Sequence, residues 1–89
     1  MFKFSKFGIQ SGEKITSIFG DEIFGIVVDD SHISIEGTRM SVSKAAIKVL
    51  SSRGVHRNNV QGTLYWKYNG IRLSDMTERN LHQSDLRTS

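Results

Sequence analysis

Two carboxylate pairs, Asp21-Glu22 and Asp29-Asp30, are the residues of this chain best suited to acid–base chemistry. Such catalysis needs two carboxyl groups in different environments, so that their pKa values separate. Both pairs instead stand where hairpin turns are expected. Asp is favoured in turns because its side chain accepts local hydrogen bonds. The pairs therefore predict turns rather than a catalytic site.

No motif for other catalytic or cofactor-binding chemistry is present in the sequence. The histidines at positions 32, 56 and 82 lack the spacing of metal ligands, and the chain contains no cysteine. It also contains no P-loop, no G-x-S-x-G elbow and no dinucleotide-binding fingerprint. We therefore expect a protein that is not an enzyme and that binds no metal or other cofactor.

Basic residues concentrate in the second half of the sequence. Residues 39–72 contain seven Lys or Arg and no Asp or Glu. The net charge is −3 over residues 1–38 and +6 over residues 39–89. This asymmetry can make one surface attractive to polyanions while the rest of the protein surface does not attract them. We expect a nucleic acid as the partner, with double-stranded DNA preferred, although these residues do not separate DNA from RNA.

A capped helix, a polar loop and an aromatic strand follow one another in this basic stretch. Lys and Arg can bind phosphates, whereas Asn and Gln can pair with adenine edges. The alternative interpretations are a solvated basic face and an ordinary polar turn. Trp66 is either a core residue, with Tyr65 and Lys67 then exposed, or a platform for base stacking. The candidate nucleic-acid-binding residues are Arg39, Ser41, Ser43, Lys44, Lys48, Arg57, Asn58, Asn59, Gln61, Tyr65, Trp66 and Lys67.

The elements that must position these residues belong to a small α+β domain. The 89 residues suffice for one domain. We expect an antiparallel sheet of four or five strands, with one main helix packed on it and short terminal helices. Alternation and turn residues predict strands over residues 13–19, 23–28 and 32–36, a brief strand at 39–40 and a last strand from 62. The apolar run 23–28 is typical of a central strand covered on both faces, or nearly so.

The main helix is predicted to begin at Ser41 or Ser43, whose hydroxyl can cap it, and to end at Gly54. Loop 54–62 follows, with Val55 and Val60 as expected anchors. A terminal helix is predicted over 73–82, and residues 83–89 are expected to fray. The helix residues expected to dock on the sheet share one stripe: Val42, Ala46, Val49 and Leu50.

The N-terminal segment, Met-Phe-Lys-Phe-Ser-Lys-Phe-Gly, lacks the apolar run of a signal peptide. The longest apolar run is too short to span a bilayer. We therefore expect a cytoplasmic protein without a membrane partner.

Several short motifs occur in a fixed order. They are Phe7-Gly8-Ile9-Gln10-Ser11-Gly12, Gly37, Ser41-Val42-Ser43-Lys44-Ala45-Ala46, Val60-Gln61-Gly62 and Tyr65-Trp66. Over residues 4–75 their order and spacing resemble the RAMA domain, a module associated with restriction enzymes and adenine methylases. The resemblance implies DNA binding, in some relatives of methylated DNA, with Ser41, Ser43, Gln61 and Trp66 at signature positions.

The sequence departs from this family pattern at three positions. Val42 replaces the usual proline, Gln61 replaces an Asn, and Thr63 stands where a tryptophan often follows the glycine. The resemblance implies a bacterial or phage accessory protein that acts in restriction–modification or in phage–host conflict. The alternative is a protein-interaction module, or a small inhibitor or regulator, that binds an acidic host or restriction-system protein.

Overall fold

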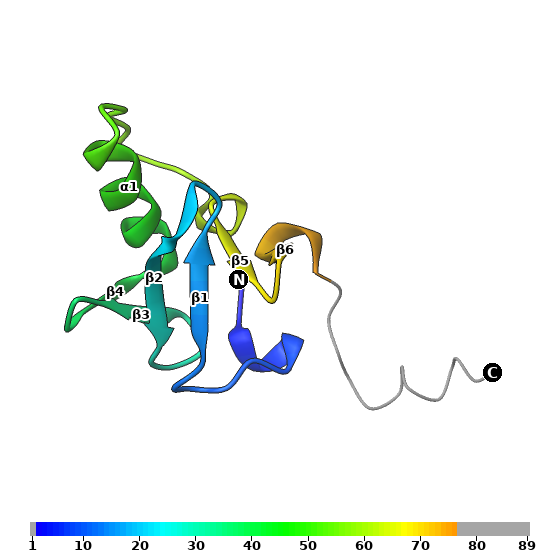
Figure 1. Cartoon of the computed structure of the whole chain (residues 1–89). Coiled ribbons are helices and arrows are strands. Elements are labelled where there is room, and N and C mark those ends of the chain that lie inside the picture. Colours follow the sequence, from blue (N-terminus) through cyan, green and yellow to red (C-terminus); the bar gives the residue numbers. More distant parts are fainter. Residues whose placement is uncertain (1, 77–89) are drawn as a thin grey trace.

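A six-stranded antiparallel sheet and one α-helix dominate residues 2–76, the part of the chain that the computed structural model describes (Figure 1). The strand order is β4-β3-β2-β1-β5-β6. The strands are β1 (Lys14–Ser17), β2 (Gly20–Val27), β3 (His32–Ile35), β4 (Thr38–Ser41), β5 (Trp66–Tyr68) and β6 (Ile71–Arg72). The helix α1 spans Val42–Ser52, and 3₁₀ helices span η1 (Phe4–Phe7), η2 (Gly62–Leu64) and η3 (Leu73–Asp75).

The predicted α+β class with one main helix is confirmed, but the predicted number of strands was too low. A tight turn at Asn69-Gly70 folds the chain back onto β5, which adds the short strand β6. Both turn residues have positive φ angles, 53° and 82°, as a two-residue hairpin turn requires. The predicted helix over 73–82 begins only as η3. Its residues from 77 onward, and the tail predicted to fray, lie outside the described part.

The first hairpin turns earlier than the sequence predicted. The chain reverses at residues 18–19, and Asp21-Glu22 lies inside β2. Ser17 stabilises this turn because its hydroxyl accepts the Phe19 N–H (3.0 Å) and donates to the Gly20 carbonyl (3.2 Å). The interpretation of Asp21-Glu22 as turn residues is therefore wrong.

Strand β2 is covered on one face only, although its residues 23–27 are all apolar or glycine. Val27 faces the core and is 2% exposed, whereas Phe24 is 44% exposed. Coverage on both faces was thus the wrong expectation for this strand. The reason is that the helix and the N-terminal segment contribute to the same core, on the side of the sheet that Val27 faces.

The core lies between α1, the N-terminal segment and one face of the sheet (Figure 1). The apolar stripe predicted for the helix is buried as expected, and Ala45 joins it. Trp66 has no exposed surface, so its interpretation as a core residue is confirmed. The clustered core residues are Phe4, Ile9, Ile15, Val27, Ile33, Ile35, Val42, Ala45, Ala46, Val49, Trp66 and Leu73.

The last predicted strand begins four residues later than expected. Residues 62–64 form η2, in which the Leu64 N–H donates to the Gln61 carbonyl at 3.1 Å. Leu64 is 36% exposed and does not share a buried strand face with Trp66. Close packing of Gly62 against α1 directs the chain into this turn before β5 starts.

Candidate nucleic-acid interface

The N-terminal end of α1 is held by its own cap residue and by a contact from a later part of the sequence. Ser41 caps the helix, because its hydroxyl accepts the Lys44 N–H at 3.1 Å. Gly62 lies directly against the first turn. A β-carbon at position 62 would be 2.7 Å from the Ser43 nitrogen and 2.7 Å from the Val42 carbonyl carbon. Only glycine fits there without displacing backbone.

This contact brings the candidate Gln61 beside two earlier candidates, Ser41 and Ser43, from the start of α1. Ser41, Ser43 and Gln61 all line one hollow of about 360 Å³, which we call the serine hollow. The Gln61 amide donates to the Thr63 hydroxyl at 3.2 Å, so its position is fixed locally. Hydroxyl and amide groups can donate to phosphate oxygens or to base edges. The remaining lining residues are Phe2, Ser31, Val42, Gly62 and Thr63.

A second and larger depression, the basic groove, has a volume of about 890 Å³ and runs between α1 and the β3–β4 hairpin. Arg39 comes from β4, and Lys44 and Lys48 come from consecutive turns of α1. All three side chains are exposed. The groove thus assembles three of the predicted phosphate-binding residues, and among the described residues that line it Glu36 is the one carboxylate.

Apolar residues form part of the same groove, and the sequence did not predict this. Ile23, Met40 and Ile47 are half-buried there, and Ile35 and Val49 lie deeper. Ile47 could have indicated such a surface, because it lies off the helix stripe that docks on the sheet. The predicted site therefore contains an apolar surface between its cations.

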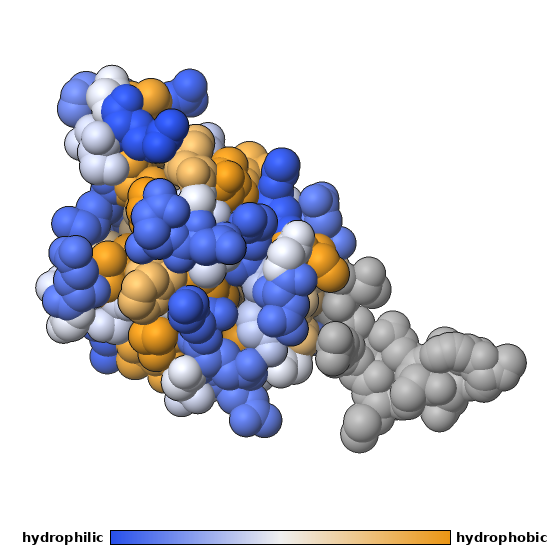
Figure 2. All heavy atoms as spheres, in the orientation of Figure 1, coloured by the Kyte–Doolittle hydropathy of each residue, from blue (hydrophilic) through white to orange (hydrophobic). Residues whose placement is uncertain are grey.

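The C-terminal end of α1 closes with a Schellman motif at Gly54, whose φ is 86°. The Val55 N–H donates to the Leu50 carbonyl at 2.9 Å, and the Gly54 N–H donates to the Ser51 carbonyl at 3.0 Å. The predicted end of the helix is thus confirmed. Figure 2 shows hydrophilic residues gathered at this tip of the molecule.

Loop residues 53–59 are all exposed, including the candidates Arg57, Asn58 and Asn59. Val60 packs against the core as predicted. Val55 is 40% exposed, so the prediction that it anchors the loop is wrong.

The aromatic and basic candidates of the last strand do not join the groove. Trp66 is fully buried, and we remove it from the candidate site because it offers no face to a base. Tyr65 is half-buried, with its ring centroid 6.4 Å from that of Phe19. The Lys67 ammonium lies 3.7 Å from the Asp21 carboxylate. Lys67 is on the sheet and lines neither the groove nor the serine hollow.

The open face of the sheet carries a further cation that the sequence did not single out. The Lys14 ammonium lies 4.7 Å from the centroid of the exposed Phe24 ring. Lys14 and Phe24 occupy neighbouring strands, and β1–β2 pairing places them on one face. The alternation of residues in β2 was the feature of the sequence that could have indicated this exposed face.

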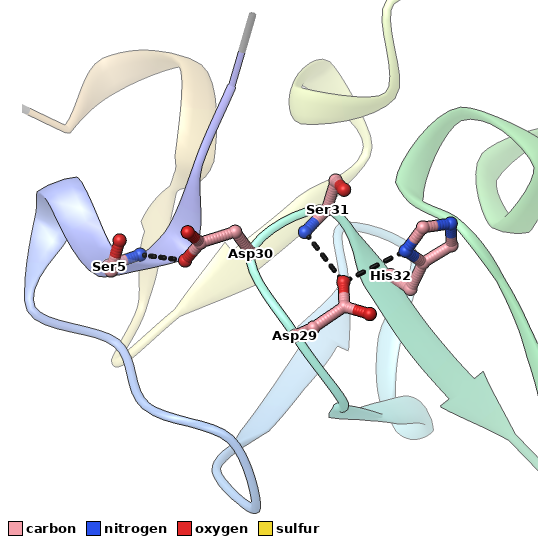
Figure 3. Close-up of polar contacts among 5 residues, drawn as sticks. All are labelled: Ser5, Asp29, Asp30, Ser31 and His32. Carbon is pink, nitrogen blue, oxygen red and sulfur yellow. Dashed lines mark hydrogen bonds and ion pairs between the residues drawn. The ribbon is translucent and has the colours of Figure 1, made fainter.

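The carboxylates Asp29 and Asp30 bind the backbone of the turn and of the N-terminal segment (Figure 3). The Asp29 carboxylate accepts the Ser31 N–H at 3.0 Å and contacts the His32 ring at 2.8 Å. These contacts, the Ser31 N–H first, lower the pKa of Asp29. Asp30 accepts the Ser5 N–H at 3.0 Å. Their interpretation as turn residues is confirmed.

Glu13 has a similar structural role at the start of β1. It accepts hydrogen bonds from the Tyr68 hydroxyl and the Gln10 N–H, and these lower the pKa of its carboxyl group in that order. Within residues 2–76, no three His, Asp or Glu side chains are grouped so that they could hold a metal ion. No helix of this same range has the length and apolar character needed to cross a membrane.

Comparison with known proteins gives no relative for this chain. No family model matches it, and searches of curated proteins and of solved structures also return no match. The resemblance to the RAMA domain therefore stays a prediction from the motifs. What the structure adds is that two of those motifs, Ser41-Val42-Ser43 and Gln61-Gly62, are in contact.

Proposed function

We propose that this protein is a non-catalytic DNA-binding module that contacts double-stranded DNA through the exposed side of α1 and the loop after it. The observation that carries the proposal is the basic groove, where Arg39, Lys44 and Lys48 converge from two elements. Residues 37–74 contain no Asp or Glu, so carboxylates from this stretch do not neutralise these cations.

The groups beside the groove support this function in different ways. Exposed cations give affinity by releasing counterions from phosphates, irrespective of sequence. The serine hollow at one end of α1 and Arg57, Asn58 and Asn59 at the other add directional donors. Lys67 and Tyr65 line neither the basic groove nor the serine hollow, so we assign them no contact with the duplex.

The resemblance to the RAMA domain supports the same function and suggests its context. The contact between its two signature segments forms the serine hollow, where the corresponding family positions imply DNA recognition. We propose that the hollow is where a modified base would be distinguished from a plain one. A role in restriction–modification or phage–host conflict follows from this part of the proposal.

The salt dependence of DNA affinity tests the electrostatic mechanism. Three cations on phosphates give a log–log slope of about −2.7, and each adds roughly −0.9. The double variant Lys44→Gln with Lys48→Gln should therefore flatten the slope by about 1.8, measured by fluorescence anisotropy on a duplex. Lys3→Gln, in the exposed N-terminal arm, should leave it unchanged and serves as the control.

A slope that is the same for the wild type and the double variant would refute phosphate binding in the groove. Adenine-methylated and unmethylated duplexes of one sequence should be compared in the same assay. A preference that disappears in the Gln61→Ala variant would assign base discrimination to the serine hollow. Equal affinities for both duplexes would restrict the function to sequence-independent DNA binding.

A further inference from the structure

The apolar part of the basic groove has a chemistry that DNA phosphates do not match. Ile23, Met40 and Ile47 are partly exposed in a groove of about 890 Å³. Ile47 lies beside Lys44 on α1, because residues three apart are neighbours on a helix, and both line the groove. A phosphate backbone can pair with the lysines of the groove, but it leaves the apolar surface exposed to water.

We infer that the basic groove binds a segment of another protein that combines apolar side chains with carboxylates. Such a segment would complement both the charge and the apolar surface of the groove. Three cations and one carboxylate line the groove, so the charged part of the ligand should be acidic. The apolar residues between those cations should bury aliphatic or aromatic side chains. A buried apolar centre with a polar rim is the usual construction of a protein interface.

The placement of the cations indicates how such a segment would lie. Lys44 and Lys48 project from α1 on one side, and Arg39 projects from β4 on the other. Carboxylates on both sides of an apolar centre would therefore be held across the groove. Glu36, at the hairpin end, would repel a carboxylate and so favours one direction of the segment. This inference rests on the groove itself and does not depend on the proposed DNA binding.

A selection from a library of random 12-residue peptides displayed on phage tests the inference. The immobilised full-length protein is the target, and the Ile47→Ser variant is used to remove peptides that bind elsewhere. Ile47 is half-buried and lies outside the core cluster, so the variant should fold. We expect enriched peptides to contain both Asp or Glu and large apolar residues. A lack of enrichment, or enriched peptides without carboxylates, would overturn the inference.

The enriched peptide should then be synthesised with a fluorescent label and titrated against matched variants. Ile47→Ser should weaken binding by about tenfold, since burial of one aliphatic side chain contributes that much or more. Val55→Ser also removes an exposed apolar side chain, but outside the groove, and should have no effect. Equal effects of these two substitutions would refute the groove as the binding site.

DNA binding by the same variants separates this inference from the proposed function. Ile47→Ser should leave DNA affinity unchanged, because phosphates contact the lysines and not the apolar surface. The double variant Lys44→Gln with Lys48→Gln should weaken the binding of both DNA and the peptide. If Ile47→Ser loses peptide binding but keeps DNA binding, the groove binds two ligands through different groups. The DNA-binding proposal and the peptide-binding inference can therefore each fail without the other.

Discussion

The two ends of α1 are built in contrasting ways. At the N-terminal end, Ser41 caps the helix and Gly62 packs against its first turn, with no room for a β-carbon. At the C-terminal end, Gly54 has a positive φ and open space around it, and the following residues to 59 are all exposed. The first end has a close backbone contact from a later segment, whereas the second is closed by local hydrogen bonds and by Arg53, whose guanidinium lies 4.4 Å from the centroid of the Phe19 ring.

Because the two ends differ, the candidate site has one part packed against the rest of the domain and one part that is exposed. The serine hollow belongs to the N-terminal end, where the Ser41 hydroxyl and the Gln61 amide each make a hydrogen bond within the domain. The loop with Arg57, Asn58 and Asn59 belongs to the exposed end. Recognition residues on loops are common where a rigid scaffold positions them. The comparison predicts that substitutions of Gly62 and Ser41 at the first end lower stability, whereas substitutions of the exposed loop residues at the second end lower DNA affinity with little effect on stability.

The largest expected effect is that of Gly62→Ala. The new β-carbon would meet α1 backbone at 2.7 Å, so we expect a loss of about 3 kcal/mol of unfolding free energy. Gly54→Ala is the matched control, because it adds the same methyl group in open space. Its cost is only that of a positive φ, about 1 kcal/mol. Urea denaturation measures both values, and equal losses would contradict the contrast between the two ends.

A smaller effect is expected from removal of the helix cap. Ser41→Ala leaves the Lys44 N–H without its side-chain acceptor and should cost about 1 kcal/mol. Ser43→Ala removes a hydroxyl two residues further along the chain. It should cost less, since Ser41 is the capping residue. Thermal unfolding of both variants checks this order. A larger loss for Ser43→Ala would show that the cap has been assigned to the wrong serine.

The smallest effect on stability is expected at the exposed end. Arg57→Ala with Asn59→Ala changes two exposed side chains and should cost under about 0.5 kcal/mol for each. DNA affinity should nevertheless fall by about tenfold, because a charge-assisted contact and a base-edge contact are removed. Anisotropy titrations on several duplexes measure the loss. An equal loss on every sequence would mean that the loop holds phosphate only.

The sequence predicted the parts of this fold that depend on local chemistry. The Gly54 stop and the cap at Ser41, one of the two serines predicted for it, follow from a positive φ angle and from side-chain hydrogen bonding, so the pattern identified them. The buried helix stripe followed from its periodicity. The two serines and the basic helix residues were likewise recognised as candidates from their types and spacing.

Features that depend on tertiary packing could not be predicted in the same way. The first hairpin turns at an apolar pair that Ser17 stabilises, and the apolar residue types of that pair do not themselves indicate a turn. Burial of Trp66 and exposure of Phe24 depend on which sheet face α1 covers. The grouping of Gln61 with Ser41 depends on the contact of Gly62 with the start of α1. The whole of α1 and the loop after it separate these residues in the sequence.

Trp66 gives this domain an internal spectroscopic reporter. It is the one tryptophan of the chain, its side chain has no exposed surface, and its indole N–H has no hydrogen-bond partner within the described residues. Its emission should therefore be blue-shifted and shielded from aqueous quenchers in the folded protein, and should shift to the red on unfolding. Trp66 lines neither the serine hollow nor the basic groove. Its fluorescence should consequently follow the integrity of the fold while ligands bind and leave at either surface.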